Sequence, residues 1–103
     1  MTETSGLRVL IVDDERAIRR FLRVSLAAHG YAVDEAETGE AALQAVIAAR
    51  PNILILDIGL PDIDGVEVTR RLREWSAVPI IILSVRNDEA EKIRALDAGA
   101  DDY

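Results

Sequence analysis

Four polar residues that could share one chemical task follow three apolar stretches of this sequence. Asp13 and Asp14 come after the first stretch, Asp57 after the second and Ser84 after the third. If the strands that precede Asp13 and Asp57 are neighbours, three carboxylates meet in the crevice where parallel sheets bind ligands. Three like charges there would repel one another unless a cation neutralised them. An oxygen-only, carboxylate-rich site suits Mg²⁺, which keeps water ligands and accepts phosphate oxygens.

Each of these residues also has a simpler structural explanation. Asp13 and Asp14 could be favoured by the dipole at a helix N-terminus. Asp57 could be a turn or capping residue, and a hydroxyl such as that of Ser84 is common at the end of a strand. These explanations need three separate coincidences at equivalent strand ends, so we favour a functional site.

Short apolar runs alternate with amphipathic helical patterns along the chain, and these elements must position the four residues. Strands are predicted at residues 7–12, 31–36, 53–56 and 79–83. The last two are apolar throughout, which is typical of strands covered on both faces. Helices are predicted from 17 to 26, from Thr38 to before Pro51, from Asp64 through Trp75, and from Asn87 or Asp88 to before Gly99. This order predicts an α/β fold, a doubly wound parallel sheet with right-handed crossovers.

Two of these helices carry further detail. Asp64 with Glu67 three residues later resembles a capping box, and Val68, Leu72 and Trp75 would share the buried face of that helix. In the helix that begins at Thr38, the alanines and the valine at positions 41, 42, 45, 46 and 49 would face inward.

Composition limits the possible classes of protein. The chain has 103 residues, enough for one domain, and it is 50% hydrophobic and 30% charged. It has no cysteine, which excludes disulfides and thiolate chemistry, and a net charge of −7, which argues against nucleic acid binding by this chain. Four arginines recur at helical spacing and are interpreted as a solvated helix face: Arg16, Arg19, Arg20 and Arg23. No apolar run reads as a membrane span or export signal, so we expect a cytoplasmic protein.

From Leu7 to Tyr103 the sequence resembles the receiver domain of two-component response regulators, which has the CheY-like, flavodoxin-like fold. The residues that carry this resemblance are Ile11-Val12-Asp13-Asp14-Glu15, Ile55-Leu56-Asp57-Ile58-Gly59-Leu60-Pro61-Asp62, Asp64-Gly65, Leu83-Ser84 and Ala98-Gly99-Ala100-Asp101-Asp102-Tyr103. Within the family the OmpR-like group is the most similar. Residues 17–23, 75–79 and 92–99 particularly resemble a regulator of a potassium-uptake operon.

The resemblance implies a role for each acidic residue. Asp57 would accept a phosphoryl group from the phosphohistidine of a sensor histidine kinase. Asp14 and Asp57 would bind Mg²⁺ directly, with the backbone carbonyl of Gly59 as a third protein ligand, and Asp13 would act largely through water. A carboxylate can attack phosphorus to form an acyl phosphate, while the cation neutralises charge on the phosphoryl oxygens.

The resemblance also implies a switch. Ser84 would hydrogen-bond the new phosphoryl oxygen, and the orientation of the Tyr103 ring would follow it. Such a domain would control transcription and would not be an enzyme, apart from its own phosphorylation and slow autodephosphorylation.

The sequence departs from the family pattern at its C-terminal side. The family has a lysine a few residues beyond the position of Tyr103, and Lys92 is the only lysine here. We therefore expect the strand order 2-1-3-4 with the fifth strand and last helix missing. Residues 1–103 would be a C-terminally incomplete receiver domain, with a DNA-binding domain following in the full-length protein. The fourth strand would then be a sheet edge, and self-association of the chain is expected.

Three other functions compete with this one. Phosphatases with an aspartate nucleophile carry a second aspartate two residues later, where this chain has Gly59. A flavin-binding, flavodoxin-like module would hold the flavin phosphate after the first strand, where Asp13-Asp14-Glu15 would repel it. The third alternative, a pseudo-receiver that binds proteins without being phosphorylated, stays open at this point.

Overall fold

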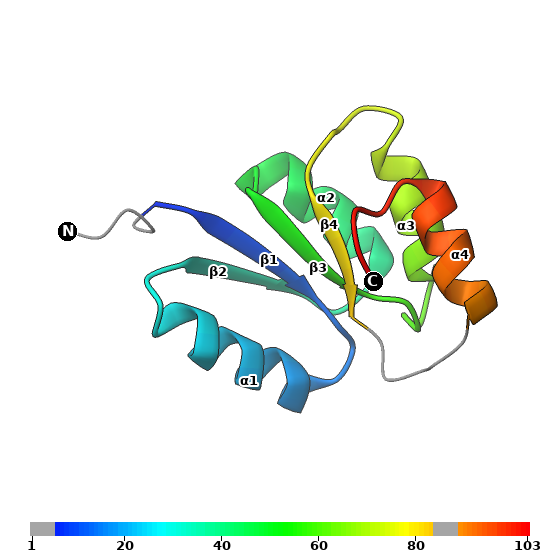
Figure 1. Ribbon diagram of the computed structural model, residues 1–103. Coiled ribbons are helices and arrows are strands. Elements are labelled where there is room, and N and C mark those ends of the chain that lie inside the picture. The colour runs from blue at the N-terminus through cyan, green and yellow to red at the C-terminus, as the bar shows by residue number, and fades with distance from the viewer. Residues whose placement is uncertain (1–5, 84–88) are drawn as a thin grey trace.

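The computed structural model describes residues 6–83 and 89–103. Strands and helices alternate along these residues (Figure 1): β1 (Arg8–Val12), α1 (Arg16–Ala27), β2 (Ala32–Ala36), α2 (Gly39–Ala49), β3 (Ile53–Asp57), α3 (Gly65–Leu72), β4 (Ile80–Leu83) and α4 (Glu89–Ala98). Both capping candidates for the last helix, Asn87 and Asp88, lie outside the described residues. No described helix is long and apolar enough to cross a membrane.

The four strands form one parallel sheet in the order β2-β1-β3-β4, which confirms the predicted order. Helix α1 lies on one side of this sheet, and α2, α3 and α4 lie on the other (Figure 1). In the register, Val12 at the end of β1 is paired with Leu56 of β3. The residues that follow these two, Asp13 and Asp57, therefore leave adjacent strands at the same edge of the sheet.

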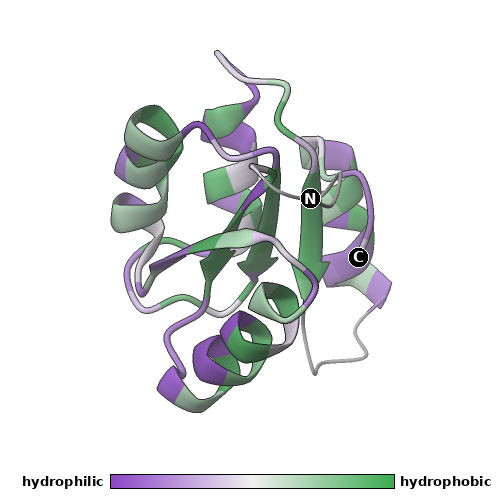
Figure 2. Cartoon of the chain, turned by 90° about the vertical axis from the view of Figure 1, so that its left-hand side faces the viewer, coloured by the Kyte–Doolittle hydropathy of each residue, from purple (hydrophilic) through white to green (hydrophobic). Residues whose placement is uncertain are grey.

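The main core lies between the sheet and the helices α2 and α3. Its most deeply buried strand residues come from β1, β3 and β4: Leu10, Val12, Leu54, Leu56, Ile80 and Ile82. The hydropathy colouring in Figure 2 shows several of the strands in the deep green of the most apolar residues. This arrangement follows from the alternation of side chains along a strand, which sends every second residue to the same face.

The opposite face of the sheet is only partly covered. Helix α1 buries Val9 and Ile11, but Ile55 and Ile81 are half-buried and Leu83 is exposed. The prediction that the third and fourth strands are covered on both faces is therefore wrong for the described residues. Their apolar sequences gave no sign of the difference, because both faces are composed of the same residue types.

The outer edge of β4 is partly paired. Asp102 forms an isolated parallel bridge with Ile81, and its carbonyl accepts from the backbone N–H of Ile82 at 3.0 Å. The Asp101 carboxylate also accepts from the backbone N–H of Ile80 at 2.8 Å. The predicted sheet edge is thus confirmed only in part, because residues 101–102 already lie along β4.

Two details of the predicted helices need correction. Helix α3 ends at Leu72, so Trp75 lies beyond it and is half exposed instead of sharing its buried face. Asp64 caps α3 as predicted and accepts from the N–H of Glu67 at 2.8 Å. The Glu67 carboxylate, however, accepts from Arg70 and Arg71 and does not complete a capping box.

Helix α2 begins as predicted, with the Thr38 hydroxyl accepting from the N–H of Ala41 at 3.0 Å. Of the residues expected to face inward, Ala42 and Val46 are buried, whereas Ala41 is exposed. Ala41 is wrongly predicted because it lies in the first turn, beside the cap.

Candidate metal and phosphoryl-acceptor site

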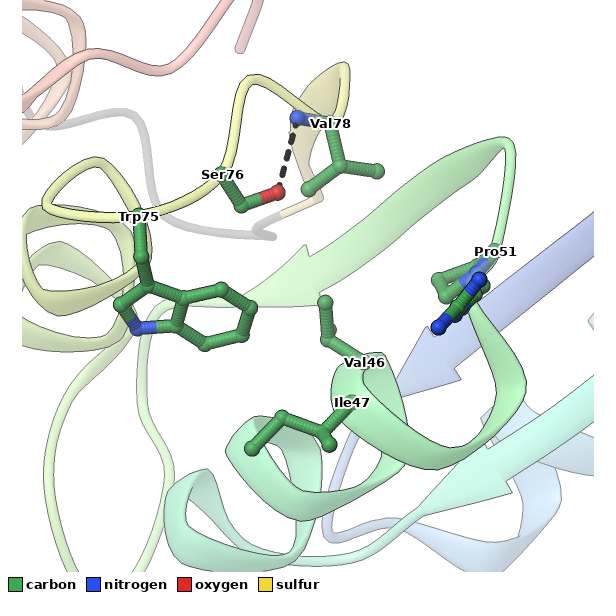
Figure 3. A pocket seen from close by; sticks show the side chains of 7 residues that line it. Val46, Ile47, Pro51, Trp75, Ser76 and Val78 are labelled. Atoms are coloured by element: carbon green, nitrogen blue, oxygen red, sulfur yellow. Dashed lines mark hydrogen bonds between the residues drawn. The ribbon is translucent and has the colours of Figure 1, made fainter.

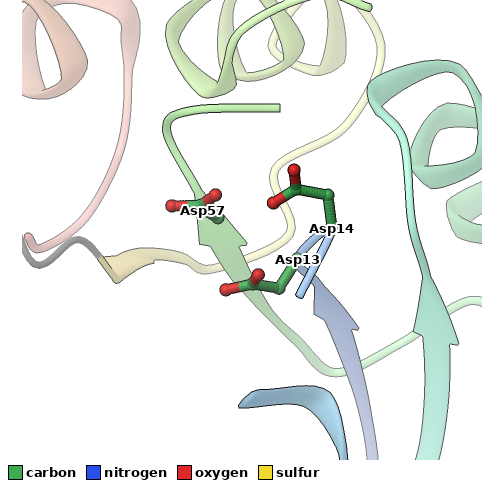
Figure 4. Close-up of side chains that lie close together, drawn as sticks. All are labelled: Asp13, Asp14 and Asp57. Carbon is green, nitrogen blue, oxygen red and sulfur yellow. The ribbon is translucent and has the colours of Figure 1, made fainter. Parts of the chain in front are cut away.

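The strand order brings three carboxylates together at the carboxyl edge of the sheet. Asp13 and Asp14 directly follow β1, and Asp57 is the last residue of the neighbouring strand β3. One carboxylate oxygen from each residue lies within 4.8 Å of the other two, and the three side chains converge in Figure 4. Asp13 is buried, Asp57 is half-buried and Asp14 is exposed, so the cluster opens to solvent on one side.

The electrostatics of this cluster favour a cation. Burial raises the pKa of the Asp57 carboxyl above its usual value of 3.8, and the charges of Asp13 and Asp14 raise it further. The backbone N–H groups of Gly59 and Ile58 act in the opposite direction. A positive ion among the three carboxylates would remove the repulsion and favour the ionised form of Asp57.

The donor set fits Mg²⁺. Its oxygen ligands bind at about 2.1 Å, so two direct ligands lie at most about 4.2 Å apart. Carboxylate oxygens spread over as much as 4.8 Å suit an ion that two of them bind directly and the third reaches through water. This is the distribution that the family resemblance implies for Asp14, Asp57 and Asp13.

The position of Asp13 is fixed by several hydrogen bonds. Its N–H donates to the carbonyl of Ala36 at 3.1 Å, and its Oδ1 accepts from the N–H of Glu15 at 2.8 Å. Its carbonyl oxygen accepts from Nη1 of Arg19 at 2.8 Å. Arg19 was predicted on a solvated helix face, but it is only 7% exposed, so that prediction is wrong for this arginine. Arg16 and Arg20 are exposed as predicted.

The loop after Asp57 is held by contacts that the sequence did not reveal. Asp62 accepts from the N–H groups of Gly39 and Glu40 at the start of α2, at 2.7 and 2.9 Å. Hydrogen bonds from these N–H groups lower the pKa of the Asp62 carboxyl to about 2. At the end of the loop, Gly65 packs so closely that a Cβ there would lie 2.6 Å from the carbonyl oxygen of Asp57.

The structure describes two of the three remaining predicted site residues. Gly59 is exposed, two residues after Asp57. Ser84 lies outside the described residues. Tyr103 packs against the main core, and its hydroxyl is buried without a hydrogen-bond partner in the described part of the chain. Its proposed role as a switch stays a prediction.

A cavity of about 310 Å³ adjoins the acidic cluster. Asp13 and Asp57 line its polar side, and the other lining residues are Glu15, Ile18, Phe21, Leu22 and Leu83. The cavity beside the acidic site therefore has an apolar wall, which α1 and the end of β4 provide.

A second cavity, of about 510 Å³, lies at the opposite, amino-terminal ends of β3 and β4. Val46, Trp75 and Val78 are among the residues that line it, and the N–H of Val78 donates to the Ser76 hydroxyl at 3.1 Å (Figure 3). No carboxylate lines this cavity in the described residues, so it does not belong to the acidic site.

Residues 9–103 match the response regulator receiver domain, and the chain therefore belongs to this family. The KDP operon transcriptional regulatory protein KdpE of Escherichia coli is 59% identical over 95 residues, 92% of this chain and 42% of that protein. The transcriptional regulatory protein ResD of Bacillus subtilis is 43% identical over 103 residues, 100% of this chain and 43% of that protein. KdpE is the regulator of a potassium-uptake operon that residues 17–23, 75–79 and 92–99 were predicted to resemble, and this similarity is confirmed. The chain spans less than half the length of these curated relatives.

Solved structures agree with the fold. A response regulator from Chloroflexus aurantiacus has a TM-score of 0.88 and 38% identity, with 94% of this chain and 82% of that chain covered. The activated receiver domain of RstA from Klebsiella pneumoniae has a TM-score of 0.90 and 28% identity, covering 93% of this chain and 82% of that chain. The parallel sheet and its helices are therefore those of a CheY-like receiver domain.

Proposed function

We propose that the chain accepts a phosphoryl group on Asp57 from the phosphohistidine of a sensor histidine kinase. The observation that carries this proposal is the convergence of three carboxylates, within 4.8 Å, at the carboxyl ends of β1 and β3. A half-buried aspartate with two acidic neighbours is unfavourable for the stability of the fold, because the neighbouring carboxylates repel its charge. It becomes useful when a cation and a phosphoryl group enter the site.

In the reaction, an oxygen of the Asp57 carboxylate forms a bond to phosphorus while the bond from phosphorus to the imidazole nitrogen breaks. The electron pair of the broken bond stays on the imidazole, and an acyl phosphate forms on Asp57. Mg²⁺, when bound, neutralises charge on the phosphoryl oxygens. Asp14, Asp57 and the backbone carbonyl of Gly59 would hold the ion directly, and Asp13 would hold it through water.

Two residues would convert the new charge into a structural signal. The Ser84 hydroxyl would donate to a phosphoryl oxygen, and the Tyr103 ring would change its orientation. The Tyr103 hydroxyl is buried without a partner among residues 6–83 and 89–103, which supports this proposal, because such a group costs free energy and would gain from moving to a partner. The domain would act as a switch and not as an enzyme beyond its own phosphorylation and slow autodephosphorylation.

The similarity to KdpE supports a role in transcriptional control. The resemblance of residues 17–23, 75–79 and 92–99 to a regulator of a potassium-uptake operon extends this role to genes of potassium uptake. The control would pass through a DNA-binding domain of the full-length protein, since a net charge of −7 opposes direct contact of this chain with DNA. A histidine kinase would be the upstream partner, and the protein would work in the cytoplasm.

The test is phosphorylation by a small donor. The protein is incubated with Mg²⁺ and acetyl phosphate, and its intact mass is measured. We expect one phosphoryl adduct in the native chain and in Asp97→Ala, which removes an exposed aspartate of α4, and none in Asp57→Ala or with a chelator. A native chain without an adduct would instead identify a pseudo-receiver, and an adduct retained in Asp57→Ala would place the acceptor elsewhere.

A further inference from the structure

We propose that Arg19 of α1 is a positioning residue for the acidic site, because its buried guanidinium holds the backbone of Asp13 in place. The inference rests on the proposed function in one respect only, the presence of a divalent cation among Asp13, Asp14 and Asp57. Arg19 would not touch the ion or the phosphoryl group. It would act through the position of Asp13.

The Arg19 guanidinium donates to three acceptors, one just after β1 and two at the end of β2. Nη1 donates to the carbonyl oxygen of Asp13 at 2.8 Å, Nε to the Glu35 carboxylate at 3.0 Å and Nη2 to the Glu37 carboxylate at 3.3 Å. The Arg19 side chain is 8% exposed, whereas those of Glu35 and Glu37 are 28% and 72% exposed. A buried charge is stable only when it is paired and hydrogen-bonded, so these contacts fix the guanidinium.

Asp13 is in turn held at each of its polar groups. Its N–H is bound to Ala36 of β2, its carbonyl oxygen to Arg19, and one carboxylate oxygen to the N–H of Glu15. The second carboxylate oxygen has no hydrogen bond in the described residues and is left for the site. These hydrogen bonds are called the clamp on Asp13. Because Asp14 is the next residue, the clamp fixes the backbone from which both side chains extend.

A second arginine supports these contacts, and a lysine could not replace Arg19. Nε of Arg23, on the next turn of α1, donates to the other oxygen of Glu35 at 2.6 Å and so steadies one of the acceptors of Arg19. A guanidinium presents its donors in a rigid planar fork, which can serve three acceptors at once. A lysine at position 19 would keep the charge but could not reproduce this fork.

Charge and positioning predict opposite effects when Arg19 is replaced. The positive charge of Arg19, which is bound to the carbonyl oxygen of Asp13, disfavours a cation at the site, so loss of the charge alone would tighten Mg²⁺ binding. Loss of the clamp would weaken it, because the carboxylates would no longer be held for one ion. The sign of the change in affinity therefore separates the two roles.

The experiment measures the dissociation constant of Mg²⁺ by calorimetry, with folding checked by circular dichroism. Arg19→Met is expected to bind Mg²⁺ about tenfold or more weakly, as for other residues that orient metal ligands. Arg19→Lys should also bind more weakly, although it keeps the charge. Arg20→Met is the matched control: it makes the same charge change on the same helix, at an exposed residue without an ion pair among the described residues, and its affinity should equal or slightly exceed that of the native chain.

A readout in the native chain keeps the test decisive if a variant fails to fold. On titration with Mg²⁺, the NMR signals of the Arg19 Nε–H and the Asp13 amide should shift with one dissociation constant. The inference is overturned if folded Arg19 variants bind Mg²⁺ like the native chain, or if the Arg19 signal does not respond. Because only Mg²⁺ is used, a chain that binds the ion but takes up no phosphoryl group would refute the proposed function and leave this inference standing.

Discussion

Asp57 is a half-buried carboxylate whose pKa is raised chiefly by burial and next by the charge of Asp13. A raised pKa in the folded state means that the folded protein binds this proton more tightly than the unfolded chain does. The ionised form of Asp57 therefore destabilises the metal-free fold at neutral pH. The residue proposed to accept the phosphoryl group is therefore one that lowers the stability of the metal-free protein.

Replacing Asp57 by asparagine should therefore raise the melting temperature of the metal-free protein at pH 7. The gain should vanish below the unfolded pKa of about 3.8, where Asp57 is protonated in both states, and should grow as pH rises through the higher folded pKa. Thermal unfolding followed by circular dichroism in a chelator, between pH 3 and 8, measures it.

Saturating Mg²⁺ should reverse this advantage, because the native chain then gains the free energy of ion binding and the asparagine variant loses a ligand. Asp97→Asn, an exposed aspartate of α4, serves as the control and should show neither effect. A variant at position 57 that is less stable than the native chain in chelator at pH 7 would contradict the repulsion described above.

At the scale of the elements, the junction between β3 and α3 sets the direction of the Asp57 backbone. The N–H of Gly65 donates to the carbonyl of Ile58 at 2.9 Å, which brings the start of α3 against the end of β3. A Cβ at position 65 would lie 2.6 Å from the carbonyl oxygen of Asp57 and 2.9 Å from Cα of Ile58. These are backbone atoms, which cannot turn aside as a side chain can.

Gly65→Ala should accordingly lower the free energy of unfolding by about 1–3 kcal/mol, the usual cost of forcing an extra group into a packed site. It should also weaken Mg²⁺ binding, since relief of the clash moves Asp57. Gly39→Ala is an informative comparison, because its nearest contact is a side-chain atom, Cγ1 of Ile63. Urea denaturation of both variants measures the costs, and a Gly65→Ala protein as stable as the native chain would show that the junction is not tightly packed.

The sequence predicted the alternation of strands and helices, the strand order and the three acidic residues, because these follow from local periodicity and from one topological rule. It could not predict the burial of Arg19, since this residue lies in α1 whereas its partners Glu35 and Glu37 lie at the end of β2. It likewise did not predict that the Asp62 carboxylate accepts from the N–H of Gly39 at the start of α2. Each of these features depends on contacts between segments far apart in sequence.

Trp75 is the clearest case of tertiary contacts overriding a helical pattern. The apolar spacing of Val68, Leu72 and Trp75 continues, but α3 ends at Leu72. The Arg73 guanidinium turns instead to the carbonyl of Gly99 at 2.9 Å and to the Asp101 carboxylate at 3.0 Å. These bonds join the end of α3 to the end of α4, and periodicity alone carries no information about them.

At the scale of the whole molecule, one apolar face remains open among the described residues. Phe21 of α1 is 68% exposed and Leu83 at the end of β4 is 41% exposed, and both line the cavity beside the acidic cluster. Next to them, Ile55 and Ile81 of the sheet are only half-buried. An apolar surface of this kind promotes association between copies in water.

The 103-residue chain is therefore expected to self-associate as its concentration rises, which analytical ultracentrifugation detects. Phe21→Ser should shift the distribution towards the monomer. Ile47→Ser removes a similarly exposed apolar side chain, 59% exposed, beside the cavity at the other end of the strands, and should have little effect. A compact monomer at all concentrations would show that the open face does not drive association.

One divalent ion shared by Asp13, Asp14 and Asp57 is the basis of the proposed function. Paramagnetic Mn²⁺ tests this most directly, because it replaces Mg²⁺ at oxygen sites and broadens the NMR signals of nearby amides. We predict that a small fraction of an equivalent of Mn²⁺ broadens the amides of Asp13, Asp14 and residues 57–59 first, and that Mg²⁺ restores them. Equal broadening at acidic residues over the whole surface, with no preference for these amides, would contradict the account.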